Sequence, residues 1–148
     1  MQIDSPALLD TNILVYAANT SSPFFKRAKA VRDQAASGKF VAYITPQICL
    51  EFFAILSNPK RLGEHVNISD AVRAVRAYQS TKHISLVLPK TTTHLHALEL
   101  CERYKLSTQE VYDAYLIATA LDNEIYTIIS ADNGMTRFKE ISVLNPFV

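Results

Sequence analysis

Short apolar runs alternate along the chain with longer segments in which apolar residues recur every three or four positions. A short continuous apolar run is typical of a buried strand, whereas the longer spacing is typical of a helix with one apolar face. The pattern predicts strands near residues 7–9, 40–44, 84–88, 125–129 and 141–143. It predicts helices over residues 13–18, 24–36, 46–58, 70–80, 92–104 and 111–121.

Strands and helices therefore alternate throughout the sequence. This order predicts an α/β fold with a mainly parallel sheet and helices on both faces. In such sheets, functional sites lie beyond the carboxyl ends of the strands.

Several predicted helices begin at residues that suit a helix start. Asp10 and Ser69 are of the types that cap helix N-termini, and Pro46 is favoured at a first helical position. Ser107 and Glu110 have the spacing of a capping box, so we expect them to open the helix over residues 111–121.

Composition narrows the class of protein without identifying it. The 148 residues suit one domain spanning residues 1–148, and a net charge of +1 provides no strong overall field for nucleic acid or membrane. Three glycines exclude a glycine-rich phosphate loop, which disfavours a Rossmann-type enzyme. With two cysteines and no signal-like N-terminal segment, we expect a cytoplasmic protein with free thiols.

The most informative residues are four acids in apolar surroundings. Asp10 and Asp132 follow predicted strands, whereas Glu51 and Asp113 lie among apolar residues of predicted helices. Each acid also has a plain structural interpretation. Asp10 is of a type that caps helices, and Asp132 is of a type found in turns. Glu51 would be the one solvent-exposed position of its helix, and Asp113 would stabilise the positive end of a helix dipole.

Taken together, the four acids favour a shared site. A carboxylate in an apolar region is costly unless it is paired, hydrogen-bonded or bound to a metal, and clustered carboxylates do not all ionise without a cation. Oxygen ligands select Mg²⁺ or Mn²⁺. The pattern therefore predicts a metal site suited to phosphodiester hydrolysis, with Asp10, Glu51, Asp113 and Asp132 as ligands and catalytic residues.

At these residues the sequence resembles the PIN-domain ribonucleases, in particular the VapC-type toxins of bacterial toxin–antitoxin pairs. The resemblance covers nearly the whole chain and includes a feature at residues 58–62 that is common in one subgroup. Four segments carry it, namely residues 8–16, 46–52, 112–120, and 129–132 with Arg137 and Phe138.

The resemblance implies a PIN-like fold, with a mainly parallel sheet of four or five strands flanked by helices. The family's acids fall on Asp10, Glu51, Asp113 and Asp132, and its supporting hydroxyl falls on Thr11. Many relatives have a second Asp where this chain has Gly134, which leaves Asp132 or Asn133 to serve instead.

By the same resemblance the protein is a Mg²⁺- or Mn²⁺-dependent endoribonuclease and the toxin of a pair. Its implied partners are an RNA substrate, a cognate VapB-like antitoxin and a second copy of itself in a homodimer, with no membrane. An antitoxin arginine set against the carboxylates would block the site by bidentate pairing. The alternatives are a catalytically weak or inactive PIN-like module that binds RNA or protein, and a flap-type nuclease, which the short length disfavours.

The remaining notable side chains are expected to be structural. His94 and His96 point in different directions on a helix and so do not share a metal, and His65 and His83 have no evident partner. Aromatic residues are expected in the core rather than as base-stacking platforms, and exposed basic residues form solvated faces. No arginine finger is evident. The aromatic residues are Phe24, Phe25, Tyr78 and Phe138, and the apolar side of the helix over residues 92–104 is expected to carry Leu95, Leu98 and Cys101.

Overall fold

The computed structural model describes residues 2–4, 6–62 and 66–148, so His65 lies outside the described residues. The strands are β1 (Ala7–Leu9), β2 (Ala42–Ile44), β3 (Ile84–Leu86), β4 (Thr127–Ile129) and β5 (Ser142–Leu144). The helices are α1 (Thr11–Ala18), α2 (Phe25–Ala36), α3 (Pro46–Leu56), α4 (Pro59–Leu62), α5 (Ile68–Gln79), α6 (Thr93–Tyr104), α7 (Glu110–Asp122) and the 3₁₀ helix η1 (Asn133–Arg137).

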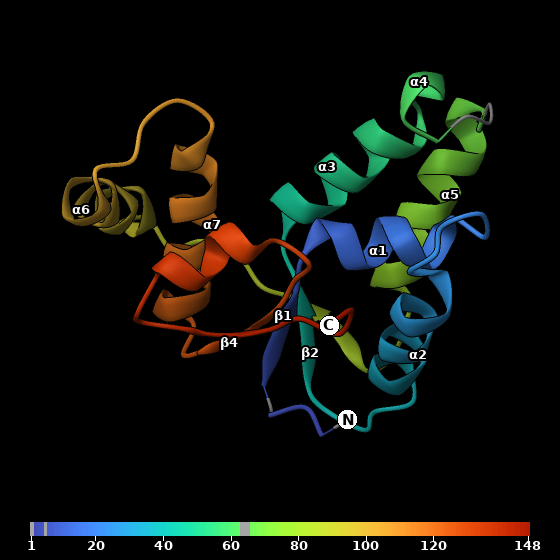
Figure 1. The fold of residues 1–148 in the computed structure, drawn as a ribbon, viewed down its shortest axis with the longest axis horizontal. Coiled ribbons are helices and arrows are strands. Elements are labelled where there is room, and N and C mark those ends of the chain that lie inside the picture. Colours follow the sequence, from blue (N-terminus) through green and yellow to red (C-terminus); the bar gives the residue numbers. More distant parts are fainter. Residues whose placement is uncertain (1, 5, 63–65) are drawn as a thin grey trace.

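The five strands form one sheet in the order β3-β2-β1-β4-β5, and every neighbouring pair is parallel. Helices α6 and α7 lie on one side of the sheet, and helices α1, α2, α3 and α5 lie on the other (Figure 1). The predicted α/β class is therefore confirmed.

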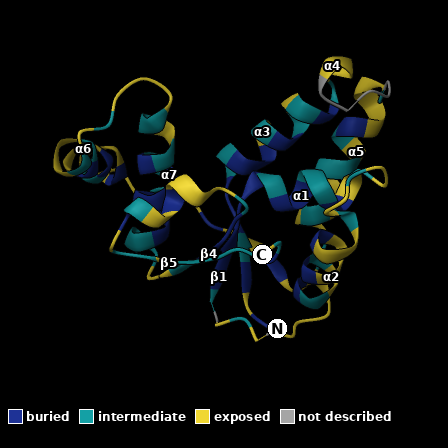
Figure 2. Ribbon diagram, in the orientation of Figure 1, coloured by how far each residue is buried: buried dark blue, intermediate teal, exposed yellow. Residues whose placement is uncertain are grey.

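The sheet is the centre of the hydrophobic core. All three residues of β1 are fully buried, and the central strands are among the most buried parts of the ribbon in Figure 2. A strand buried on both faces reads as a continuous apolar run, which explains why the strands were recognisable without polar alternation.

The strand order creates a switch point between β1 and β4. The chain moves outward from β1 through β2 to β3, and then returns to place β4 on the other side of β1. Crevices at the carboxyl ends of strands beside such a reversal are where open α/β sheets bind ligands. Asp10 and Ser130 follow β1 and β4 directly, so both residues lie at this edge.

Helix α6 buries a different side from the one predicted. Leu95 and Leu98 are 53% and 57% exposed, whereas Thr93, Ala97 and Leu100 are buried. The apolar spacing was compatible with either side. The structure buries the side with Thr93 because the hydroxyl of that residue is hydrogen-bonded between Lys90 N–H and the carboxylate of Asp122.

Two predicted helix caps are also wrong. Helix α5 begins two residues earlier than expected, because the side chain of Asn67 accepts from Asp70 N–H. At α7 no side chain caps the helix, and Ser107 contributes only its carbonyl oxygen to Glu110 N–H. The Glu110 carboxylate is engaged by Arg137 instead of by the helix start.

Within the described residues, no helix is both long enough and apolar enough to cross a membrane. Both cysteines are free; Cys49 is buried, as expected, whereas Cys101 is only partly buried.

Candidate active site

Asp10 lies at the carboxyl end of β1 and caps helix α1. Its Oδ1 accepts from Thr11 N–H at 2.7 Å. Its Oδ2 accepts from the Ser130 hydroxyl at 2.6 Å and from Asn12 Nδ2 at 3.2 Å. The capping role and the site role therefore coincide in one side chain, which three donors hold in place.

The surroundings of Asp10 oppose its negative charge. Burial raises the pKa of the Asp10 carboxyl, and the nearby carboxylates of Glu51 and Asp132 raise it further. The hydrogen bonds from Ser130 and Thr11 act in the other direction and lower it. A cation at this position would offset the same repulsion.

Glu51 is half-buried on helix α3 and faces Asp10 across the start of helix α1. Its Oε2 accepts from the Thr11 hydroxyl at 2.6 Å, and its Oε1 accepts from Gln47 Nε2 at 2.9 Å. Helix α3 presents Glu51 here because Thr45 caps it directly after β2, at the same edge of the sheet. Thr11 thus links two of the predicted acids, one through its backbone and one through its hydroxyl.

Asp113 reaches the same place from the first turn of helix α7. Burial and the charges of Asp132, Asp10 and Glu51 raise its pKa to about 6, against the lowering effect of Arg137. The Arg137 guanidinium donates to Asp113 Oδ2 at 3.2 Å and to Glu110 Oε2 at 2.6 Å.

Arg137 thus stands beside a predicted acid, although no arginine finger was expected from the sequence. It lies at the end of η1 and 24 positions from Asp113 in the chain. The resemblance to the PIN-domain family was the sequence signal that drew attention to Arg137. Local sequence does not reveal which side chain folds against Asp113.

Asp132 follows β4 closely and caps η1, where its Oδ1 accepts from Gly134 N–H at 2.7 Å. A β-carbon on Gly134 would lie 3.0 Å from that oxygen, so any side chain at position 134 would crowd Asp132. Asn133 is not brought into the pocket. Its side chain is exposed and accepts from Asn145 Nδ2 at 3.4 Å.

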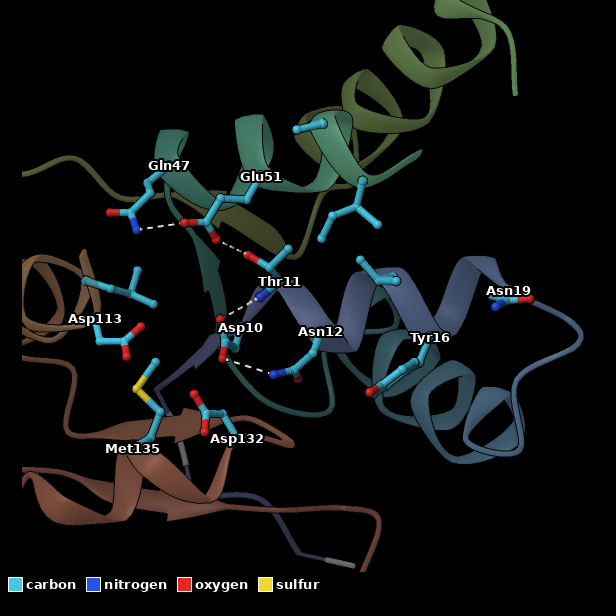
Figure 3. Close-up of a pocket in the computed structure, with 14 residues that line it drawn as sticks. Asp10, Thr11, Asn12, Tyr16, Asn19, Gln47, Glu51, Asp113, Asp132 and Met135 are labelled. Carbon is cyan, nitrogen blue, oxygen red and sulfur yellow. Dashed lines mark hydrogen bonds between the residues drawn. The ribbon is translucent and has the colours of Figure 1, made fainter. Parts of the chain in front are cut away.

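The four acids line one open cavity of about 650 Å³. In Figure 3, Asp10 lies between Glu51 above it and Asp132 below it, with Asp113 to the left and Asn12 to the right. Asn12, Gln47 and Ser130 hold the acids in place, although the sequence pattern gave these three residues no such role. Their signal was weak, because each is a common polar residue next to a stronger motif.

The donor set is chemically suited to a divalent cation. Carboxylate oxygens are hard ligands, and all four acids line the same cavity. As the side chains stand in the described part of the chain, no three His, Cys, Asp or Glu residues form a close ligand group. Carboxylates that share a field repel one another, and a cation would draw them together.

The family model for the PIN domain matches residues 7–141. The chain belongs to the PIN-domain family. The matched range contains all four acids, and the PIN fold expected from the resemblance is confirmed.

Known proteins are similar to this chain over most of its length. Ribonuclease VapC48 of Mycobacterium tuberculosis is 25% identical over 138 residues, which cover 93% of this chain and 95% of that protein. The crystal structure of Mycobacterium tuberculosis VapC20, described as a Sarcin-Ricin loop cleaving toxin, has a TM-score of 0.69 at 19% identity and covers 92% of this chain and 98% of its own. A toxin–antitoxin complex from Klebsiella pneumoniae has a TM-score of 0.64 at 19% identity, over 95% and 98% of the two chains.

Of the other side chains expected to be structural, some are packed or paired within the fold and one is exposed. His96 pairs with Asp122 at 2.8 Å between helices α6 and α7, and Phe138 is buried in the core. The prediction that Phe24 lies in the core is wrong. Its side chain is 38% exposed, and its ring packs against Tyr16 near the surface.

Proposed function

We propose that this PIN-domain protein is an endoribonuclease that acts as the toxin of a toxin–antitoxin pair. The observation that carries the proposal is the convergence of Asp10, Glu51, Asp113 and Asp132 on one pocket at the switch point of the sheet. The similarity to ribonucleases of the VapC type supports RNA as the substrate.

The four acids would hold a divalent cation, and we propose Mg²⁺ or Mn²⁺. When bound, such an ion lowers the pKa of a coordinated water and offsets the charge that develops on the phosphate. The protein's own contribution is orientation. Ser130 and Asn12 fix the Asp10 carboxylate, and Thr11 and Gln47 fix Glu51.

Arg137 has a separate role in this arrangement. Its guanidinium bridges Glu110 and Asp113, so it restrains the carboxylate that helix α7 contributes and offsets part of the charge there. We propose that Arg137 is a positioning residue for Asp113.

An antitoxin and a second copy of the chain are the proposed protein partners. Toxin–antitoxin complexes among the similar structures support the antitoxin. The homodimer stays a prediction, and the exposed apolar side chains of Leu95, Leu98 and Tyr112 on α6 and α7 offer a surface for it.

The test is cleavage of total and transfer RNA by the purified protein with Mg²⁺, with Mn²⁺ or with EDTA. We expect cleavage with metal and none with EDTA. Asp10→Asn keeps the size of the side chain but removes a charge, and we expect a loss of about 100-fold or more with the fold retained. Near-normal cleavage by Asp10→Asn contradicts the assignment, whereas metal-dependent cleavage by the wild type contradicts the alternative of an inactive binding module.

A further inference from the structure

Three aromatic rings pack together beside Tyr16, a residue that lines the cavity shared by the four acids (the acidic pocket). Tyr16 lines the pocket, and its ring centroid lies 5.0 Å from that of Phe24 and 5.4 Å from that of Phe147. The Phe24 and Phe147 centroids are 4.9 Å apart. The rings come from α1, from the residue before α2 and from the C-terminal segment, so the fold assembles this cluster from distant parts of the sequence.

The cluster is open to solvent in a way that the core aromatics are not. Phe24 is 38% exposed, whereas Phe138 and Phe52 are each 1% exposed. Tyr16 and Phe147 are partly buried. The cluster therefore joins an exposed ring, Phe24, to a ring that lines the acidic pocket, Tyr16, and an exposed aromatic face is one on which a flat ligand group can stack.

Helix geometry places the cluster next to the acids. Asn12 donates to Asp10, and Tyr16 lies four residues further along the same face of α1. Four residues advance a helix by about 6 Å, so Tyr16 is one turn from the residue that touches the Asp10 carboxylate. Figure 3 shows Asn12, Tyr16 and Asn19 in succession along one side of the pocket. A nucleotide adjacent to the scissile phosphate spans such a distance.

Charge near the cluster favours the same ligand. Lys26 and Arg27 directly follow Phe24 and Phe25 in the sequence, and both basic residues are exposed. The described residues that line the acidic pocket include no lysine or arginine. The phosphates of an RNA that reaches Phe24 would meet this positive charge at the start of α2.

We propose that Tyr16, Phe24 and Phe147 form a stacking platform for an unpaired base of single-stranded RNA, next to the bond that the acids cleave. The inference rests on the proposed ribonuclease function and adds the residues that would hold a base beside the cleaved bond. Proteins that read unpaired RNA stack splayed bases on aromatic side chains, and such stacking tolerates different bases.

The chain contains no tryptophan, which permits a direct test. Phe24→Trp places a single indole in the platform, in an Asp113→Asn background that leaves the RNA intact. The matched control is Tyr126→Trp in the same background, because Tyr126 is 56% exposed directly before β4, at the opposite end of that strand from the site. The probe is a labelled single-stranded RNA oligonucleotide with Mg²⁺, and a duplex of the same sequence is the comparison.

We expect the oligonucleotide to quench the indole at position 24 and not the indole at position 126. The duplex should quench the indole at position 24 only weakly. RNA anisotropy measures binding separately. Phe24→Leu, which keeps an apolar side chain, should weaken binding about tenfold, whereas Tyr126→Leu should not.

Two failures are distinguishable. Cleavage and binding without quenching of the indole at position 24, or equal quenching by duplex, overturn the platform and leave the ribonuclease function in place. If no RNA is bound and the wild type cleaves none with metal, the proposed function fails and the platform fails with it.

Discussion

The carboxyl group of Asp113 makes the stability of the metal-free protein depend on pH. Its pKa rises from 3.8 in the unfolded chain to about 6 in the folded protein, chiefly because of burial. The folded state therefore binds more protons than the unfolded state between these values, so stability falls as pH rises from about 4 to about 6.

The Asp113→Asn variant removes this penalty. In EDTA we expect its melting temperature to exceed that of the wild type at pH 7.5, because no charge is buried there. The advantage should vanish near pH 4, where Asp113 is protonated in the wild type. Thermal unfolding followed by circular dichroism at both pH values measures it. An advantage that does not change with pH would rule out the titration of Asp113 as its cause.

Thr11 is the residue that couples two acids, so its hydroxyl should matter for activity. Thr11→Val keeps the shape of the side chain but removes the 2.6 Å hydrogen bond to Glu51. We expect metal-dependent cleavage to fall by about 10- to 100-fold, as for other side chains that orient metal ligands. Thr11→Ser restores the hydroxyl and should stay near wild-type activity. Equal activity of the Val and Ser variants would show that the bond is dispensable.

At the level of single residues, the sequence was most informative where a charged side chain interrupts an apolar segment. Asp10 and Glu51 were recognisable because an acid in an apolar segment needs a reason. Ser130 was not, although its hydroxyl contacts Asp10, because a serine after a strand is ordinary. Phe24 was predicted in the core because it is apolar. Its exposure depends on how the loop before α2 packs, which the local sequence does not reveal.

Helices α6 and α7 are joined by a part-buried polar contact as well as by apolar side chains. Thr93 is fully buried, and its hydroxyl accepts from Lys90 N–H at 2.8 Å and donates to Asp122 Oδ2 at 2.7 Å. Thr93→Val should lower the free energy of unfolding by about 0.5–1.5 kcal/mol, because Lys90 N–H and the part-buried Asp122 carboxylate each lose a hydrogen-bond partner.

The control for this prediction is the neighbouring residue. Thr92 is exposed and makes no side-chain capping bond, so Thr92→Val should change stability by no more than about 0.5 kcal/mol. Urea unfolding of both variants measures the difference. A similar small effect for Thr93→Val would mean that the contact does not hold the two helices together.

The exposed side of α6 predicts the oligomeric state. Leu98 is 57% exposed, and replacing it with Lys should cost little stability in a monomer but place a charge in an apolar dimer interface. We expect the wild type to be a dimer and Leu98→Lys a monomer by light scattering. Glu99→Lys, at the adjacent exposed position, is the control. A dimer that survives Leu98→Lys would place the interface elsewhere.

Element by element, the pattern of apolar residues located the strands and most helices, but it did not fix how they pack. For α6 the spacing allowed two faces, and the contact between Thr93 and Asp122 decided between them. For α7 the expected cap at Ser107 failed because Glu110 is used by Arg137, a contact between residues 27 positions apart. Short elements such as α4 and η1 had too few residues to show a period.

At the scale of the whole molecule, strand order is what makes the site. The order β3-β2-β1-β4-β5 places residues 10 and 130 in hydrogen-bond contact, although they are 120 positions apart in the chain. The alternation of strands and helices predicted a parallel sheet, and the rule for strand ends predicted the edge at which the acids meet. The position of Arg137 required the folded chain.

A cleavage assay with Mn²⁺ that compares two aspartates tests whether the acidic pocket is the active site. Asp113→Asn removes an acid of the pocket, whereas Asp33→Asn makes the same chemical change on the exposed side of α2. We predict that RNA cleavage is lost by about 100-fold or more in Asp113→Asn and is unchanged in Asp33→Asn. Equal cleavage by the two variants would show that the reaction takes place elsewhere than in the acidic pocket.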